Sequence, residues 1–134
     1  MRAGEHRRYE IPSRLLELAP LRASVRTLAS EHGFGRQALD DLELCVHEAV
    51  SNAMVHGHGL DPVLKVVVIF EAVGEGLRVT VRDQGPGFDP ATVARPAAPP
   101  GEEARGRGLQ IISRLCTSQE WLDGGRTLVF VKAP

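Results

Sequence analysis

The segment 42–58 has the sequence LELCVHEAVSNAMVHGH and predicts the helix around which the rest of the chain is organised. At α-helical spacing Glu48, Asn52 and His56 recur every four residues and project from one side. Apolar residues fall on the other side and would pack inward: Leu42, Val46, Ala49, Val50 and Ala53. A carboxylate can accept a proton, and an amide oxygen suits Mg²⁺. A polar helix face that only meets water would have the same pattern.

The segments around this helix predict two layers. Before it, 7–11 predicts a short edge strand stopped by Pro12, and 13–32 predicts helix with a break or fresh start at Pro20. The central helix is predicted over 36–56. After it, 63–73 and 77–82 predict an antiparallel hairpin, 106–116 a helix, and 120–122 with 127–132 a second hairpin. The fold class is therefore predicted to be α+β, a two-layer α/β sandwich with a mostly antiparallel sheet and helices on one face.

Length and composition bound the class of protein. A chain of 134 residues predicts a single domain, 1–134, large enough to bury a core. A formal net charge of −1 gives no indication of nucleic acid or of an anionic membrane as partner. We find no signal-peptide pattern and no membrane span, and therefore expect a cytoplasmic protein. Cys45 and Cys116 match no metal or redox spacing and are interpreted as buried thiols.

Two glycine-rich segments in the second half predict a ligand site. Asp83 ends a predicted strand and could accept a hydrogen bond from an exocyclic amine, while Gly85 and Gly87 would let the backbone approach a flat ring. Gly106 and Gly108 open a predicted helix, whose free N–H groups and dipole attract phosphate. Together with the central helix, these segments predict a pocket for a purine nucleotide, with a metal between base and phosphates.

Each of these motifs has a purely structural alternative. The pattern D-x-G-x-G is often only a turn, and glycine precedes many helices. His56 could cap a helix end, and Arg105 and Arg107, which could contact phosphate, could instead be solvated. The nucleotide hypothesis therefore depends on the order and joint occurrence of the motifs.

Three motifs in this order resemble the N, G1 and G2 boxes of the GHKL (histidine-kinase-like) ATPase superfamily: ExxxNAxxH at 48–56, DxGxGF at 83–88 and GxGL at 106–109. That superfamily includes the ATP-binding domains of gyrase, Hsp90, histidine kinases and MutL. The glutamate that heads the first box and the short chain are most similar to the anti-sigma-factor serine/threonine-protein kinases of bacterial sporulation and stress switches. The resemblance covers most of the chain and implies the GHKL (Bergerat) ATP-binding fold.

The resemblance also implies roles for single residues. Asn52 would coordinate Mg²⁺ on the phosphates of ATP, and Glu48 would be the catalytic base toward a seryl hydroxyl. Asp83 would bind the adenine amine, Thr127 would lie near the adenine, and the segment 90–105 would be the ATP lid. The full set of expected nucleotide-binding residues is Asn52, His56, Asp83, Gly85, Gly87, Arg105, Gly106, Arg107, Gly108, Leu109 and Thr127.

The leading hypothesis is an ATP-dependent serine-protein kinase that is also an anti-sigma factor. Its expected partners are a sigma factor and an anti-sigma-factor antagonist that carries the phosphorylated serine, and family members usually form a homodimer through the first helices and the sheet edge. One alternative is a nucleotide-sensing regulatory binding module with little kinase activity. Others are the ATPase part of a split two-component histidine kinase and a small α+β protein without a ligand.

Overall fold

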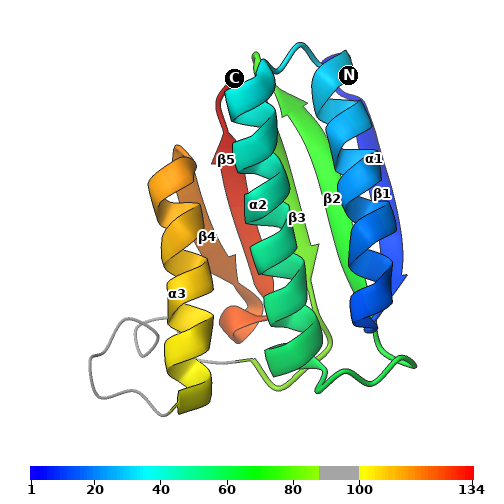
Figure 1. Ribbon diagram of the computed structural model, residues 1–134, viewed down its shortest axis with the longest axis vertical. Helices are drawn as coiled ribbons and strands as arrows, with labels where there is room; N and C mark the ends of the chain where they lie inside the picture. Colours follow the sequence, from blue (N-terminus) through cyan, green and yellow to red (C-terminus); the bar gives the residue numbers. More distant parts are fainter. Residues whose placement is uncertain (88–99) are drawn as a thin grey trace.

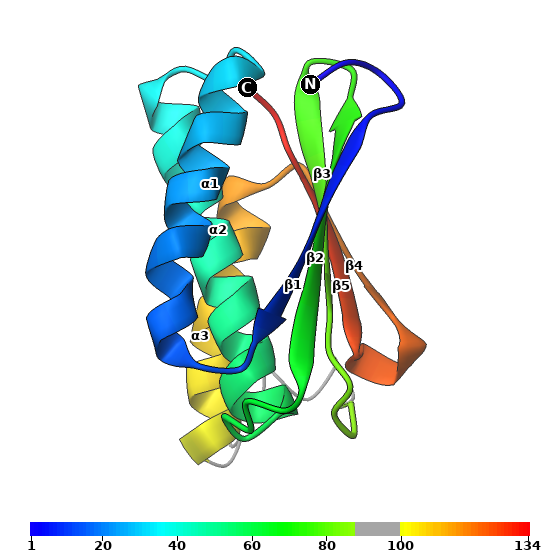
Figure 2. The ribbon, with the colours of Figure 1, turned by 90° about the vertical axis from the view of Figure 1, so that its right-hand side faces the viewer.

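The computed structural model describes residues 1–87 and 100–134, with the side chains of 100–107 excepted. Its strands form one antiparallel sheet in the order β1-β2-β3-β5-β4, and its long helices cover one face of that sheet (Figure 2). The strands are β1 His6–Pro12, β2 Lys65–Val73, β3 Gly76–Arg82, β4 Ser118–Leu122 and β5 Thr127–Lys132. The helices are α1 Leu18–Glu31, α2 Arg36–Asn52 and α3 Pro100–Leu115, with short helical turns η1 Leu15–Glu17, η2 Ala53–Gly57 and η4 Asp123–Gly125. The predicted two-layer α+β sandwich is confirmed.

The central strands bury every second side chain, as the period of a strand requires. Val66, Val68 and Phe70 of β2 are fully buried, whereas the residues between them are only partly covered. In the antiparallel register Phe70 lies opposite Val79 and Val68 lies opposite Val81 on β3. These cross-strand pairs form the floor on which the helices pack.

Helix α2 lies in the middle of the helical layer, between α1 and α3 (Figure 1). Its buried positions contain the stripe predicted from the sequence, and Cys45 is buried with them. Both neighbouring helices pack against α2. The helix that carries Glu48 and Asn52 is thus held on three sides by packing against α1, α3 and the sheet.

Strand β1 and the start of helix α1 were both predicted from the sequence. Strand β1 lies at the sheet edge, as predicted, and pairs only with β2 among the described strands. Of the two alternatives expected at Pro20, a break or a fresh helix start, the structure has a helix start, because α1 starts at Leu18 and Pro20 is its third residue. The N–H groups of a first helical turn have no intrahelical partner, so proline costs nothing there.

The central helix changes its geometry where the first box ends. The regular α-helix ends at Asn52 and continues as a π-helical turn over Ala53–Gly57. His56 therefore lies in a wider turn than Glu48 and Asn52 do. π-turns inside helices often mark functional sites.

Candidate functional site

The end of η2 meets the end of β3 at a junction made of glycines. A Cβ atom on Gly57 would lie 2.8 Å from Cγ of Asp83, and one on Gly85 would lie 2.1 Å from the carbonyl oxygen of Gly57. The carboxylate of Asp83 accepts a hydrogen bond of 2.8 Å from the Gly85 N–H through Oδ1. Asp83 therefore lies against the C-terminal end of the central helical segment, with its carboxylate orientated by the loop that follows it.

A buried histidine ties this junction to the start of the chain. His58 Nε2 accepts a hydrogen bond of 2.7 Å from the backbone N–H of Gln84, which requires the proton to reside on Nδ1. His58 Nδ1 then donates to the hydroxyl of Ser13 at 2.7 Å. Both side chains are buried. Sequence reasoning missed Ser13, Gly57 and His58 as residues of this region; the His-Gly repeat over 56–59 was the available signal.

The loop after Asp83 is held from the other side by the start of β5. The Arg126 guanidinium donates to the carbonyl oxygens of Gly85 at 2.8 Å and Pro86 at 3.1 Å. Gly87 has a φ of +76°, and a Cβ there would lie 2.2 Å from the carbonyl oxygen of Gly124. These contacts explain why the predicted motif needs glycine at 85 and at 87. Arg126 is a further residue of this region that sequence reasoning missed.

Thr127 follows Arg126 and is almost completely buried. It lies opposite Arg82, the last residue of β3, and its hydroxyl donates to Asp123 Oδ2 at 3.0 Å. The backbone N–H of Asp83 donates to the carbonyl oxygen of Arg126 at 2.9 Å. The structure thus brings Thr127 beside the strand end that carries Asp83.

A second junction lies at the seam between α2 and α3. A Cβ atom on Gly108 would lie 2.7 Å from Glu48 Oε2, so the carboxylate lies directly over this glycine. Leu109, the next residue, is buried in the core and packs α3 onto the rest of the molecule. Glu48 and Asn52 are each partly exposed, one helical turn apart on α2. Glu48 and Gly108 therefore meet at this seam, and Asn52 follows Glu48 one turn later on α2.

The structure corrects the predicted start of the third helix. Helix α3 begins at Pro100 and not at Gly106, so Gly106 and Gly108 lie inside it. Proline suits the first position of a helix, and two glutamates follow near the positive end of the helix dipole, which explains the earlier start. The expected glycine-rich helix N-terminus is therefore wrong in this conformation.

The remaining expectations about this region fall partly outside the described residues. Residues 90–99 of the expected lid lie outside them, and 100–105 form the start of α3. Arg105 and Arg107 lie on α3, but their side chains are also outside the described part. His56 is partly buried in η2.

Within residues 1–87 and 108–134, no three His, Cys, Asp or Glu side chains lie close enough to bind a metal by themselves. A Mg²⁺ ion bound together with phosphates needs only one or two protein oxygens, and the amide of Asn52 can supply one. The donor set is thus compatible with a metal that arrives with a nucleotide.

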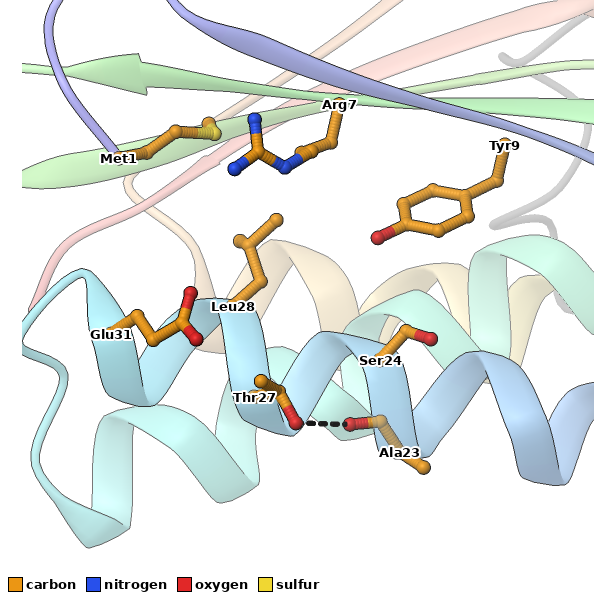
Figure 3. Close-up of a pocket in the computed structure, with 8 residues that line it drawn as sticks. All are labelled: Met1, Arg7, Tyr9, Ala23, Ser24, Thr27, Leu28 and Glu31. Carbon is orange, nitrogen blue, oxygen red and sulfur yellow. Dashed lines mark hydrogen bonds between the residues drawn. The ribbon is translucent and has the colours of Figure 1, made fainter.

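A hollow of about 350 Å³ lies elsewhere, between α1 and β1 (Figure 3). Its lining residues are Met1, Arg7, Tyr9, Ala23, Ser24, Thr27, Leu28 and Glu31. It contains none of the residues gathered at the two junctions.

Comparison with known proteins agrees with the fold and the motifs. The family model of the histidine kinase-like ATPase domain matches residues 11–132. The serine-protein kinase RsbW of Bacillus licheniformis is 30% identical over 88 residues, which span 66% of this chain and only 55% of that protein. The serine-protein kinase RsbW of Listeria innocua is 30% identical over 119 residues, which span 83% of this chain and 76% of that protein.

A solved structure shows the same fold. The RsbU and RsbW domains of a Mycobacterium tuberculosis protein match with a TM-score of 0.63 at 17% identity, over 96% of this chain and 31% of that chain. Fold and motifs together define the class, a GHKL-type ATP-binding domain. The chain belongs to the histidine kinase-like ATPase domain family, and within it the chain is similar to serine-protein kinases named RsbW. None of the helices within residues 1–87 and 100–134 has the length and the apolar character that a membrane-spanning segment needs.

Proposed function

We propose that this chain is an ATP-dependent serine-protein kinase and an anti-sigma factor. It would transfer the γ-phosphoryl group of ATP to a seryl residue of an anti-sigma-factor antagonist and would also bind a sigma factor. The observation that carries the proposal is the contact of Glu48 with Gly108. Glu48 precedes Asn52 by one helical turn on α2. Phosphoryl transfer requires a proton acceptor and a metal ligand close together, and the proposal gives these roles to Glu48 and to Asn52, one turn apart on α2.

Each residue has a defined task in this proposal. Glu48 takes the proton of the seryl hydroxyl as the oxygen attacks phosphorus. Asn52 offers its amide oxygen to Mg²⁺, which would neutralise the charge of the phosphates when bound. Asp83 accepts a hydrogen bond from the adenine amine, and its carboxylate is already orientated by the Gly85 N–H. The junction at Glu48 and the junction at Gly57 follow one another along the segment formed by α2 and η2. In the proposal, the first binds the phosphates of ATP and the second binds the adenine.

The proposal extends to the organisation of the protein. Residues 1–134 act as one domain, and 90–105 act as the lid over the nucleotide. The working form is a cytoplasmic homodimer without direct contact to nucleic acid or membrane. The names of the RsbW relatives, serine-protein kinases, support the kinase activity. The resemblance of the three motifs to those of the anti-sigma-factor kinases supports a sigma factor as partner.

A second candidate is a nucleotide-sensing binding module with little kinase activity. The position of Gly106 and Gly108 inside α3 favours it, because N–H groups beyond the first turn of a helix are bonded within that helix. Phosphate could then reach these groups only after the first turns of α3 rearrange. In such a module, this rearrangement would itself be the output of nucleotide binding.

One experiment separates the two candidates. The purified chain is incubated with Mg-ATP labelled at the γ-phosphate and with an extract of its source cell, and labelled proteins are identified by mass spectrometry. The kinase proposal expects phosphoserine on one small protein, with no label when Glu48→Gln replaces the wild type. Binding of ATP without any transfer would favour the sensing module. A melting temperature that millimolar Mg-ATP leaves unchanged would contradict both.

A further inference from the structure

Two cysteines that are far apart in the sequence lie together at the α2–α3 seam. Cys45 is on α2 and fully buried, and Cys116 follows the last residue of α3 and is partly exposed. Their Sγ atoms are 3.6 Å apart, although 71 residues separate them. The interpretation as a buried thiol is therefore confirmed for Cys45, whereas Cys116 is partly exposed and the two sulfurs are in contact.

The surroundings give the two thiols different reactivity. The hydrogen bond between the two thiols lowers the pKa of Cys116, as does the nearby Lys132 ammonium, against the opposing effects of burial and of Asp41. The same hydrogen bond, together with burial, raises the pKa of Cys45. The thiolate is the nucleophilic form, so the accessible Cys116 reacts first and the buried Cys45 stays protonated beside it.

We propose that Cys45 and Cys116 are a redox-responsive dithiol, which a hydroperoxide converts into an intramolecular disulfide linking α2 to the end of α3. The proposal concerns a modification site and does not depend on kinase activity. Sites of this type pair an accessible, low-pKa cysteine with a resolving cysteine in contact.

The oxidation of the two thiols to a disulfide proceeds in two steps. The Cys116 thiolate attacks one oxygen of the hydroperoxide, the O–O bond breaks, and Cys116 sulfenic acid forms with release of water or an alcohol. Cys45 sulfur then attacks Cys116 Sγ, the S–O bond breaks, and the hydroxide leaves as water with the proton of Cys45. Two thiols are oxidised by two electrons in total, and one hydroperoxide is reduced.

The geometry requires little movement for this step. A disulfide bond is about 2.05 Å long, so the sulfurs must approach by about 1.5 Å from their separation of 3.6 Å. Cys116 lies just beyond the end of α3, and its backbone N–H donates to the carbonyl oxygen of Ile112 at 2.9 Å, so the approach is made mainly by side-chain rotation. A cross-link here closes a long loop of the chain, and closing a long loop restricts the unfolded state.

The test uses the full chain, first reduced and then exposed to one equivalent of hydrogen peroxide. Free thiols are alkylated, and the protein is digested without reductant for peptide mapping. We expect a cross-linked peptide pair containing Cys45 and Cys116, a monomeric band on a non-reducing gel, and full reversal by dithiothreitol. The melting temperature of the oxidised form should rise by about 5 °C or more.

Two variants assign the roles of the sulfurs. Cys45→Ala should leave Cys116 as a sulfenic acid that dimedone traps, and Cys116→Ala should leave Cys45 unmodified. Alkylation of Cys116 in the wild type should follow a pH profile displaced below that of an ordinary cysteine. Two free thiols after peroxide treatment, a disulfide between two copies of the chain, or sulfinic acid at Cys116 as the main product would overturn the proposal. The peptide map of the wild type shows whether the Cys45–Cys116 disulfide forms, even if a variant fails to fold.

Discussion

Glu48 and Gly108 are in contact across the seam between α2 and α3, and the absence of a side chain at 108 is what allows it. A Cβ there would lie 2.7 Å from Glu48 Oε2 but 3.7 Å from Glu48 Cδ, so only the end of a flexible side chain stands in the way. A methyl group at position 108 should therefore leave the fold intact but displace the carboxylate of Glu48. This difference separates stability from activity in an experiment.

Gly108→Ala should keep the protein folded and displace Glu48. Alanine is favoured over glycine inside a helix by about 1 kcal/mol, so the melting temperature should stay the same or rise. A displaced catalytic group should lower phosphoryl transfer by about tenfold to a hundredfold. Gln110→Ala, at an exposed position on the same helix, is the control and should have neither effect. Unchanged transfer in Gly108→Ala would mean that the position of Glu48 does not matter.

Glu48→Gln should retain ATP binding and lose catalysis. The amide keeps the size of the side chain but cannot accept the seryl proton, so transfer should fall by about a hundredfold or more. ATP affinity from calorimetry should stay within a few fold. Glu31→Gln on α1, remote from the seam, is the charge-matched control. Wild-type turnover in Glu48→Gln would remove Glu48 from the role of base.

Asn52→Ala should abolish the effect of Mg²⁺ on ATP binding. The wild type should bind ATP more tightly with Mg²⁺ than with a chelator, since the amide oxygen contributes to the coordination of the metal. The variant should show the same weak affinity under both conditions. Calorimetry with and without the metal measures this, and an unaltered metal response would contradict the assignment.

Gly85→Ala should destabilise the fold and eliminate nucleotide binding. The new methyl would lie 2.1 Å from the backbone carbonyl oxygen of Gly57, which has no flexible way to move aside. We expect a loss of about 1–3 kcal/mol in the free energy of unfolding, typical of overpacking. Gly35→Ala is the matched control, because a Cβ at Gly35 meets nothing within 4 Å. Equal melting temperatures for the two variants would show that the junction is looser than described.

His58→Ala should weaken the same junction through its hydrogen bonds. It removes the acceptor for the Gln84 N–H and the donor to Ser13, two bonds of 2.7 Å in a buried setting. A loss of about 1–3 kcal/mol is expected for buried groups left unpaired. Chemical denaturation of His58→Ala, Ser13→Ala and the double variant should show coupling between the two sites. Additive losses would mean that the two side chains act independently.

Several elements could be predicted from the sequence because local periodicity encodes them. The buried stripe of α2 follows a helical repeat, and the alternation of Val66, Val68 and Phe70 follows the period of a strand. The start of α3 could not be predicted in this way. Glycine at 106 and 108 and proline at 100 are both helix-boundary signals, and only the packing of the whole helix decides between them.

The sequence by itself therefore determined the class of fold, the order of its elements and the three motifs of the ATPase family. Periodicity, turn residues and motif spacing are properties of residues close together in the chain, so they can be recognised in the sequence alone. Tertiary structure alone decided that Cys45 lies against Cys116, that Ser13 meets His58, and that Glu48 covers Gly108. Each of these contacts joins residues 45 or more positions apart. Such pairs form only when the helices and the sheet pack into one core, and no local pattern records which side chains that packing brings together.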